Sequence, residues 1–202
     1  VIGMFVGLLV TAIIQSSSAT TVMVVGFVNA GLMNLMQALS VVLGANIGTT
    51  ITAQIIAFKI SHLALPAIGI GVVMRLFIKG KNTHNYGEIL LGFGFLFLGM
   101  ETMTKGFAPL NHNETFKHAF VLFANPFLAV FAGTVLTMVV QSSSATLGIT
   151  IALATIGIID YRAACALVLG ENIGTTITAN LAAIGANKAA RRAALGHLLF
   201  NT

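Results

Sequence analysis

The six residues QSSSAT at positions 15–20 return unchanged at positions 141–146. Each copy directly follows an apolar stretch, so three consecutive serines occur twice in an otherwise hydrocarbon-like sequence. The same offset of 126 residues, from 15 to 141, superposes GANIGTTITAQ at 44–54 on GENIGTTITAN at 170–180 without a gap. Two motifs in one register indicate an internal duplication.

The duplication extends over residues 5–57 and 131–183, where 23 of 53 aligned pairs are identical. The identical positions are concentrated among polar residues and glycine, whereas the apolar positions vary among Val, Ile, Leu, Ala and Met. This pattern is expected when the polar positions have a chemical role and the others need only be apolar.

Composition predicts a membrane protein. Hydrophobic residues make up 57% of the chain and charged residues 7%, and the mean hydropathy is +0.98. Residues 1–58 and 119–159 contain no Asp, Glu, Lys or Arg, whereas one membrane span needs only about 20 apolar residues. We therefore expect a multi-pass protein of the cell (plasma or inner) membrane. The net charge of +5 lies in short loops, which favours an orienting role over nucleic-acid binding.

The expected fold is all-α, with two inverted repeats that each contain a re-entrant helical hairpin and a discontinuous transmembrane helix. In the first repeat, residues 1–60, the arms on either side of QSSS are too short to span, which predicts a re-entrant hairpin over 1–30. A helix over 35–58 is long enough to cross, but the glycines and asparagine of GANIGTT predict a break at its middle.

Residues 61–118 are expected to form connecting transmembrane helices. The second repeat, residues 119–202, is expected to hold a re-entrant hairpin over 119–157, a broken helix over 163–185 and the start of a further helix. Three crossings separate the two hairpins in this topology, so the second hairpin enters from the opposite side of the membrane. Inverted repeats of this kind are typical of secondary transporters.

Basic residues in short loops favour the cytoplasm. In the expected topology, six of them share the side on which the first hairpin opens: Arg75, Lys79, Lys81, Lys188, Arg191 and Arg192. Four lie on the other side: Lys59, Lys105, Lys117 and Arg162. This excess predicts that the first hairpin opens to the cytoplasm and the second to the outside.

The motifs favour binding of an anion together with a cation. A helix that begins after QSSS presents unpaired N–H groups and about half a positive charge, and serine hydroxyls add donors. A break at GANIGTT would free carbonyl oxygens, which hard cations prefer. The predicted substrate and sodium site, formed by both copies near the midplane, consists of Gln15, Ser16, Ser17, Ser18, Asn46, Thr49, Thr50, Gln141, Ser142, Ser143, Ser144, Asn172, Thr175 and Thr176.

This set contains no Lys or Arg, so co-bound cations must neutralise a divalent anion. Sodium coupling follows as a hypothesis, and no other cofactor is expected. One position differs between the copies, because Ala45 corresponds to Glu171. An ionisable residue at membrane depth predicts a cation or proton site; the alternative is a carboxylate that pairs with backbone N–H groups or reaches water. Sodium and proton coupling both stay open.

QSSS in both halves, each followed by GxNIGTT, resembles the type II sodium-phosphate cotransporters in a bacterial form. The resemblance covers residues 1–60 and 127–202. It implies sodium-driven uptake of inorganic phosphate by alternating access, with residues 15–18 and 141–144 at the substrate and sodium sites, Asn46 and Asn172 nearby, and an elevator-like movement of the hairpins. The partners implied are phosphate, sodium ions and the lipid bilayer, with no nucleic acid and with a homodimer left open.

The residues bear on three other functions. The sequence has no G-x-S-x-G elbow and no histidine near either QSSS, so it does not predict a serine hydrolase or another enzyme. A channel-like membrane subunit remains an alternative, because re-entrant hairpins also build filters. A carrier of another small anion, such as a dicarboxylate, is the other alternative. His62 and His197 are expected at the membrane interface rather than as ligands.

Overall fold

The computed structural model describes residues 1–58, 60–114, 120 and 122–202. Every regular element in these ranges is helical, which confirms the prediction of an all-α fold. Lys59, Lys117 and the expected start of the second hairpin at Ala119 lie outside the described residues.

The first half of the chain contains α1 (Ile2–Ile14), α2 (Ser17–Asn29), α3 (Leu35–Ala57), the 3₁₀ turn η1 (Ser61–Leu63), α4 (Ala64–Leu76) and α5 (Lys81–Phe107). The rest contains η2 (Ala108–His112), η3 (Leu122–Ala124), α7 (Pro126–Val140), α8 (Ser143–Thr155), α9 (Tyr161–Ala182) and α10 (Lys188–Asn201). The offset of 126 residues places the start of α2 on that of α8 and the start of α3 on that of α9. The duplication in the sequence is therefore also a duplication of helices.

The two copies share their local start and stop signals. α2 and α8 are both followed by a glycine with a positive φ, Gly31 at 74° and Gly157 at 78°, a conformation that glycine adopts without a steric penalty. The next helix begins in both copies with a side-chain cap, from Asn34 in α3 and Asp160 in α9. These turns give both copies the same helix–helix–helix layout.

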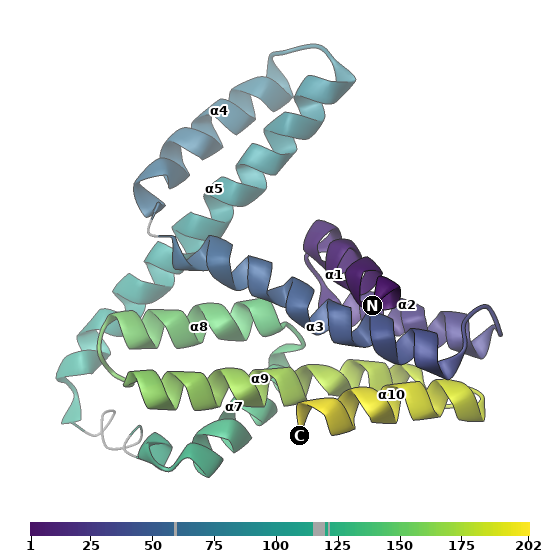
Figure 1. Cartoon of the computed structure of the whole chain (residues 1–202). Helices are drawn as coiled ribbons and strands as arrows, with labels where there is room; N and C mark the ends of the chain where they lie inside the picture. Colours follow the sequence, from purple (N-terminus) through teal and green to yellow (C-terminus); the bar gives the residue numbers. More distant parts are fainter. Residues whose placement is uncertain (59, 115–119, 121) are drawn as a thin grey trace.

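Figure 1 shows α4 and the adjoining part of α5 as an arm that leaves the other helices, whereas α10 lies beside α9. One apolar core joins α2, α3, α9 and α10, and a second lies among α7, α8 and α9. At the far end of the first core, the Asn187 amide group donates to the carbonyls of Val28 and Asn29. The two halves of the chain therefore pack against each other.

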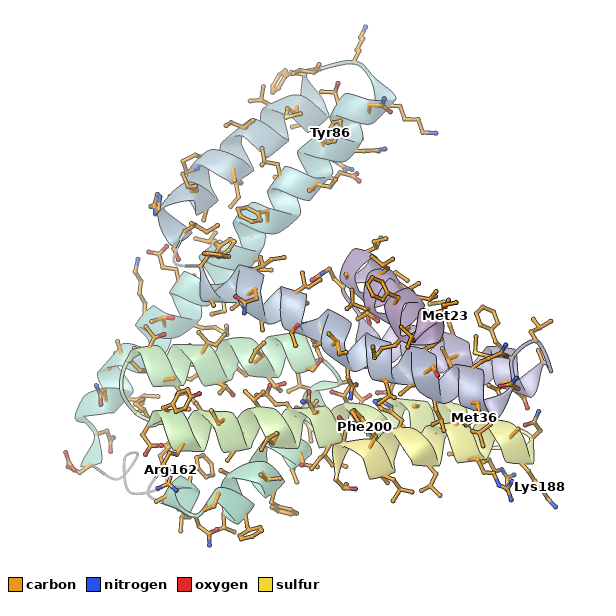
Figure 2. The ribbon with its side chains drawn as sticks, in the orientation of Figure 1. Met23, Met36, Tyr86, Arg162, Lys188 and Phe200 are labelled. Atoms are coloured by element: carbon orange, nitrogen blue, oxygen red, sulfur yellow. The ribbon has the colours of Figure 1, made fainter. Side chains whose placement is uncertain are left out.

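Two helical segments of the described chain, α3 and Lys81–Asn111, are long and apolar enough to cross a membrane. The segment Ser61–Leu76 is shorter than the roughly 20 residues that a span needs. Figure 2 shows Arg162 and Lys188 at opposite ends of the pair formed by α9 and α10. Large apolar side chains such as Phe5 and Phe131 are exposed along the hairpins, as expected for surfaces that face lipid.

The prediction that the two GxNIGTT helices are broken is wrong. α3 runs without interruption from Leu35 to Ala57, and α9 from Tyr161 to Ala182. The glycines serve close packing instead. A Cβ atom on Gly44 would lie 1.9 Å from the Met4 carbonyl oxygen, and one on Gly48 would lie 2.7 Å from Cβ of Thr11. Glycine is therefore required because α1 approaches α3 at backbone distance.

The second copy repeats this packing at equivalent atoms. A Cβ atom on Gly170 would lie 2.0 Å from the Val130 carbonyl oxygen, and one on Gly174 would lie 2.7 Å from Cβ of Thr137. The glycines of the GxNIGTT motif thus allow each hairpin to pack closely against its own long helix.

Candidate functional site

Each QSSS segment forms the turn of a helical hairpin. Gln15 ends α1 in the left-handed conformation, with φ 58°, and Gln141 ends α7 with φ 59°. The amide of Gln15 donates to the Ala12 carbonyl, and that of Gln141 to the Met138 carbonyl. A left-handed residue other than glycine costs about 1–2 kcal/mol, so the same costly turn is maintained at both tips.

The serine after each glutamine caps the second arm of its hairpin. The hydroxyl of Ser16 accepts a hydrogen bond from the Ala19 N–H at 3.2 Å, and that of Ser142 accepts one from the Ala145 N–H at 3.3 Å. α2 and α8 therefore begin at the tips, with the remaining N–H groups of their first turns directed out of the helix ends. The partial positive charge of each helix dipole is located there.

The two tips meet at one small cavity of about 60 Å³. In Figure 1, α2 and α8 extend to opposite sides of this region. The cavity can hold a small ion and a few water molecules, since a single water needs at least about 10–15 Å³. Its lining consists of Gln15, Ser16, Ser17, Ser18, Thr49, Gln141, Ser142, Ser143 and Ser144. None of these described residues is charged, so donors rather than fixed charges surround the space.

The structure brings together nine of the fourteen residues predicted for the site. The other five do not line the cavity: Asn46, Thr50, Asn172, Thr175 and Thr176. Because the long helices are continuous, their threonines have no second half-helix to cap. The hydroxyl of Thr50 donates to the Ile47 carbonyl, and that of Thr176 to the Ile173 carbonyl, the usual way in which a helix satisfies such a side chain.

Asn46 belongs to a separate, partly buried polar cluster. Its amide donates to Oδ1 of Asn201 at 2.8 Å, and its Oδ1 lies 3.3 Å from Nε2 of His197. His197 is only 1% exposed, so its side chain packs inside the protein. Asn201 in turn donates to the His197 carbonyl. The i, i+4 spacing of His197 and Asn201 places both on one face of α10. The sequence does not show that this face packs against Asn46 on α3.

Glu171 lies in the interior between α8 and α9 and is 2% exposed. Its Oε1 accepts a hydrogen bond from the Thr150 hydroxyl at 2.7 Å. The ion pairs found in the described part of the chain join Arg75 with Glu88 and Lys105 with Glu101, so neither involves Glu171. In the first copy the equivalent positions are apolar, because Val24 and Ala45 replace the polar pair.

The sequence did not predict which residues outside the tips bond to them. The Thr52 hydroxyl donates to Oε1 of Gln15 at 2.7 Å and so ties the first tip to α3. In the second copy, Thr178 donates to the Thr175 carbonyl of its own helix. The repeated threonine of QSSSAT, Thr20 and Thr146, bonds a threonine on the other arm of its hairpin.

A larger hollow of about 570 Å³ lies between η3, α7 and the start of α9. Apolar side chains such as Phe127, Val130 and Leu169 form most of its wall. None of the residues at the serine tips contributes to it, so volume alone does not identify the polar site.

Comparison with known proteins agrees with the duplication. The sequence model of the family described as Na+/Pi-cotransporter matches the chain twice, over residues 1–105 and 98–201. No solved structure matches the chain.

Several curated proteins are similar in sequence. "Putative inorganic phosphate export protein YjbB" of Escherichia coli (strain K12) is 37% identical over 195 residues, which are 96% of this chain and 36% of that protein. "Uncharacterized protein YqeW" of Bacillus subtilis (strain 168) is 35% identical over 200 residues, 97% of this chain and 64% of that protein. "Sodium-dependent phosphate transport protein 2A" of Ovis aries is 46% identical over 57 residues, 28% of this chain and 9% of that protein. The chain thus spans between about a third and two thirds of the two bacterial relatives.

Proposed function

Because the chain belongs to the Na+/Pi-cotransporter family, we propose that it carries inorganic phosphate across a membrane together with sodium ions. The observation that supports this most directly is the uncharged cavity shared by the two serine tips. The names of two relatives point the same way, since one describes phosphate export and the other sodium-dependent phosphate transport.

The proposed anion site consists of the two helix N-termini and the serine hydroxyls beside them. Each N-terminus contributes about half a positive charge, so α2 and α8 together offset about one negative charge. A doubly charged phosphate would keep about one uncompensated charge, which is costly away from water. A co-bound sodium ion supplies the missing charge, and hydroxyl and amide oxygens are ligands that hard cations accept.

For the mechanism we propose alternating access between two inverted repeats, with the hairpins re-entrant in the membrane. Two features support this proposal. The hairpin tips converge on one cavity while α2 and α8 extend away from it on different sides, and each hairpin packs on its long helix through equivalent glycines. Secondary transporters commonly place their substrate between inverted repeats near the midplane.

Glu171 is proposed as the second cation site, for a coupling sodium ion or a proton. A buried carboxylate without a basic partner is strongly destabilised when charged. The Thr150 hydroxyl is its one hydrogen-bond donor from a side chain in the described residues, and a single neutral donor does not offset the charge. Binding of a small cation or a proton would remove the penalty.

The test is uptake of labelled phosphate by the purified protein in proteoliposomes, with and without an inward sodium gradient. We expect uptake that falls when choline replaces sodium and that unlabelled succinate does not inhibit. Equal uptake in choline would remove sodium coupling, and strong inhibition by succinate would favour a dicarboxylate carrier. Single cysteines at Lys81 and Lys188 should react with an impermeant reagent from the same face, and labelling from opposite faces would contradict the inverted topology.

A further inference from the structure

We propose that two buried threonine pairs, Thr11 with Thr20 and Thr137 with Thr146, are positioning residues that aim the two serine tips into the cavity. The pairs occupy equivalent places in the two copies, because each member is displaced by 126 residues from its counterpart. All four side chains are at most 2% exposed. Their consequence for transport rests on the proposed function, whereas their effect on the tips does not.

The first pair joins the two arms of the first hairpin immediately behind its tip. The Thr11 hydroxyl, in the last turn of α1, donates to Oγ1 of Thr20 at 3.0 Å. The Thr20 hydroxyl donates in turn to the Ser16 carbonyl at 3.1 Å. A hydroxyl has one proton to donate, so these bonds form an ordered chain from α1 through Thr20 to the residue that caps α2.

The second pair repeats the arrangement. Oγ1 of Thr137 and Oγ1 of Thr146 are 3.1 Å apart, and the Thr146 hydroxyl lies 3.2 Å from the Ser142 carbonyl and 3.0 Å from the Ser143 carbonyl. Because the Thr146 proton is directed to these carbonyls, Thr137 is the donor within the pair. The carbonyls of both tips are thus held by hydroxyls from inside the hairpins.

Holding these carbonyls has a consequence for the cavity. A trans peptide unit is planar, and its N–H points opposite to its C=O. The Ser16 carbonyl accepts both the backbone N–H and the hydroxyl of Thr20, each at 3.1 Å. The N–H of Ser17 in the same peptide unit is therefore directed out of the helix end, where the tips line the cavity. The same relation holds between Ser142 and Ser143. The backbone bonds of α2 and α8 set this direction, and the threonine pairs add a second bond that restrains the donors an anion would meet.

Packing alone does not require these hydroxyls. Two valines would fill nearly the same volume, and replacing both partners of a buried hydrogen bond with apolar groups of the same shape is close to neutral for stability. The four hydroxyls are instead all buried and hydrogen-bonded, and each chain of bonds runs toward its tip.

The test combines backbone exchange with transport. Thr11→Val/Thr20→Val and Thr137→Val/Thr146→Val should keep the melting temperature close to that of the wild type. Hydrogen exchange of the tip amides, residues 16–20 or 142–146, should become about fivefold faster, as expected for the loss of one net hydrogen bond. The apparent KM for phosphate should rise by a similar factor, with a smaller change in the maximal rate.

Two controls separate positioning from general loosening. Thr20→Ser keeps the hydroxyl and should leave both exchange and KM at their wild-type values. Thr134→Val removes a hydroxyl in the same second hairpin that bonds the Val130 and Gly170 carbonyls, so it should leave tip exchange and KM unchanged. Unchanged tip exchange in both valine pairs would overturn the inference, as would faster exchange with an unchanged KM. If the wild type carries no phosphate, the proposed function fails, and the exchange measurement still decides whether the pairs order the tips.

Discussion

The Thr150 hydroxyl donates to Glu171 across the contact between α8 and α9, 2.7 Å from Oε1, and this polar pair has apolar counterparts in the other copy. The duplicated halves are therefore chemically unequal at one buried place. If Glu171 has its proposed role, one half responds to a cation or a proton while the other keeps an apolar contact.

Replacing Glu171 with glutamine should retain the fold but abolish the dependence of phosphate uptake on either sodium or pH. Gln keeps an oxygen that accepts from Thr150 and carries no charge, so we expect the free energy of unfolding to change by less than about 1 kcal/mol. If Glu171 binds sodium, the ratio of phosphate uptake in sodium to uptake in choline should fall toward one. If it binds a proton, the pH dependence of uptake should flatten instead. A variant that keeps both responses would remove Glu171 from the coupling mechanism.

Thr150→Val should be more harmful to stability than Glu171→Gln. It leaves a buried carboxyl group without its hydroxyl donor, which costs about 1–3 kcal/mol. Denaturation of the two variants in detergent micelles compares them directly, and the double variant shows whether the two effects are coupled. Equal stability of the two single variants would contradict this account of the pair.

The glycines of the long helices are expected to tolerate no side chain. Gly44→Ala and Gly170→Ala place a Cβ atom 1.9 and 2.0 Å from carbonyl oxygens of the facing hairpin, so each should destabilise the protein by about 3 kcal/mol or more. Gly26→Ala is the matched control, because its Cβ would meet nothing within 4 Å and alanine favours the helix by about 0.5–1 kcal/mol. Destabilisation by Gly26→Ala equal to that of the other two would argue against a packing role.

The bond between Thr52 and Gln15 should make the first tip more sensitive than the second. Thr52→Val removes the donor to Oε1 of Gln15 and should raise the apparent KM for phosphate up to about fivefold. Thr178→Val makes the same change in the other copy, where the hydroxyl bonds only its own helix. Its effect should stay within about 0.5 kcal/mol in stability and leave KM unchanged. Equal effects on KM would show that the bond to Gln15 does not matter.

Ser17 and Ser143 line the cavity, and their hydroxyls are not the side-chain caps of their helices. Ser17→Ala and Ser143→Ala should each weaken phosphate transport by about tenfold, since a hydrogen bond to a charged group contributes about 1.5–3 kcal/mol. Expression should stay intact. Ser40→Ala, which removes a hydroxyl bonded to the Met36 carbonyl, is the control. Wild-type transport in both tip variants would exclude these hydroxyls from the site.

Local signals explain how much of the fold was predictable. The hairpin turns depend on residues within one helical turn of QSSS, namely a left-handed glutamine and a serine cap, so both tips could be placed from the sequence. Local signals could not decide whether α3 and α9 are broken or continuous. A glycine in an apolar helix is compatible with a break or with a close neighbour, and the distance to Met4 and Val130 decides between them.

The sequence by itself determined that the chain is duplicated, helical and apolar, and that an uncharged, serine-rich turn occurs once in each half. These properties depend on composition, on repeats and on interactions within a few residues. Only the tertiary structure decided that the two turns share a cavity, that Asn46 faces His197 rather than that cavity, and that Glu171 is buried against Thr150. The physical reason is that each of these contacts joins residues on different helices, and such distances are fixed by the packing of the whole bundle.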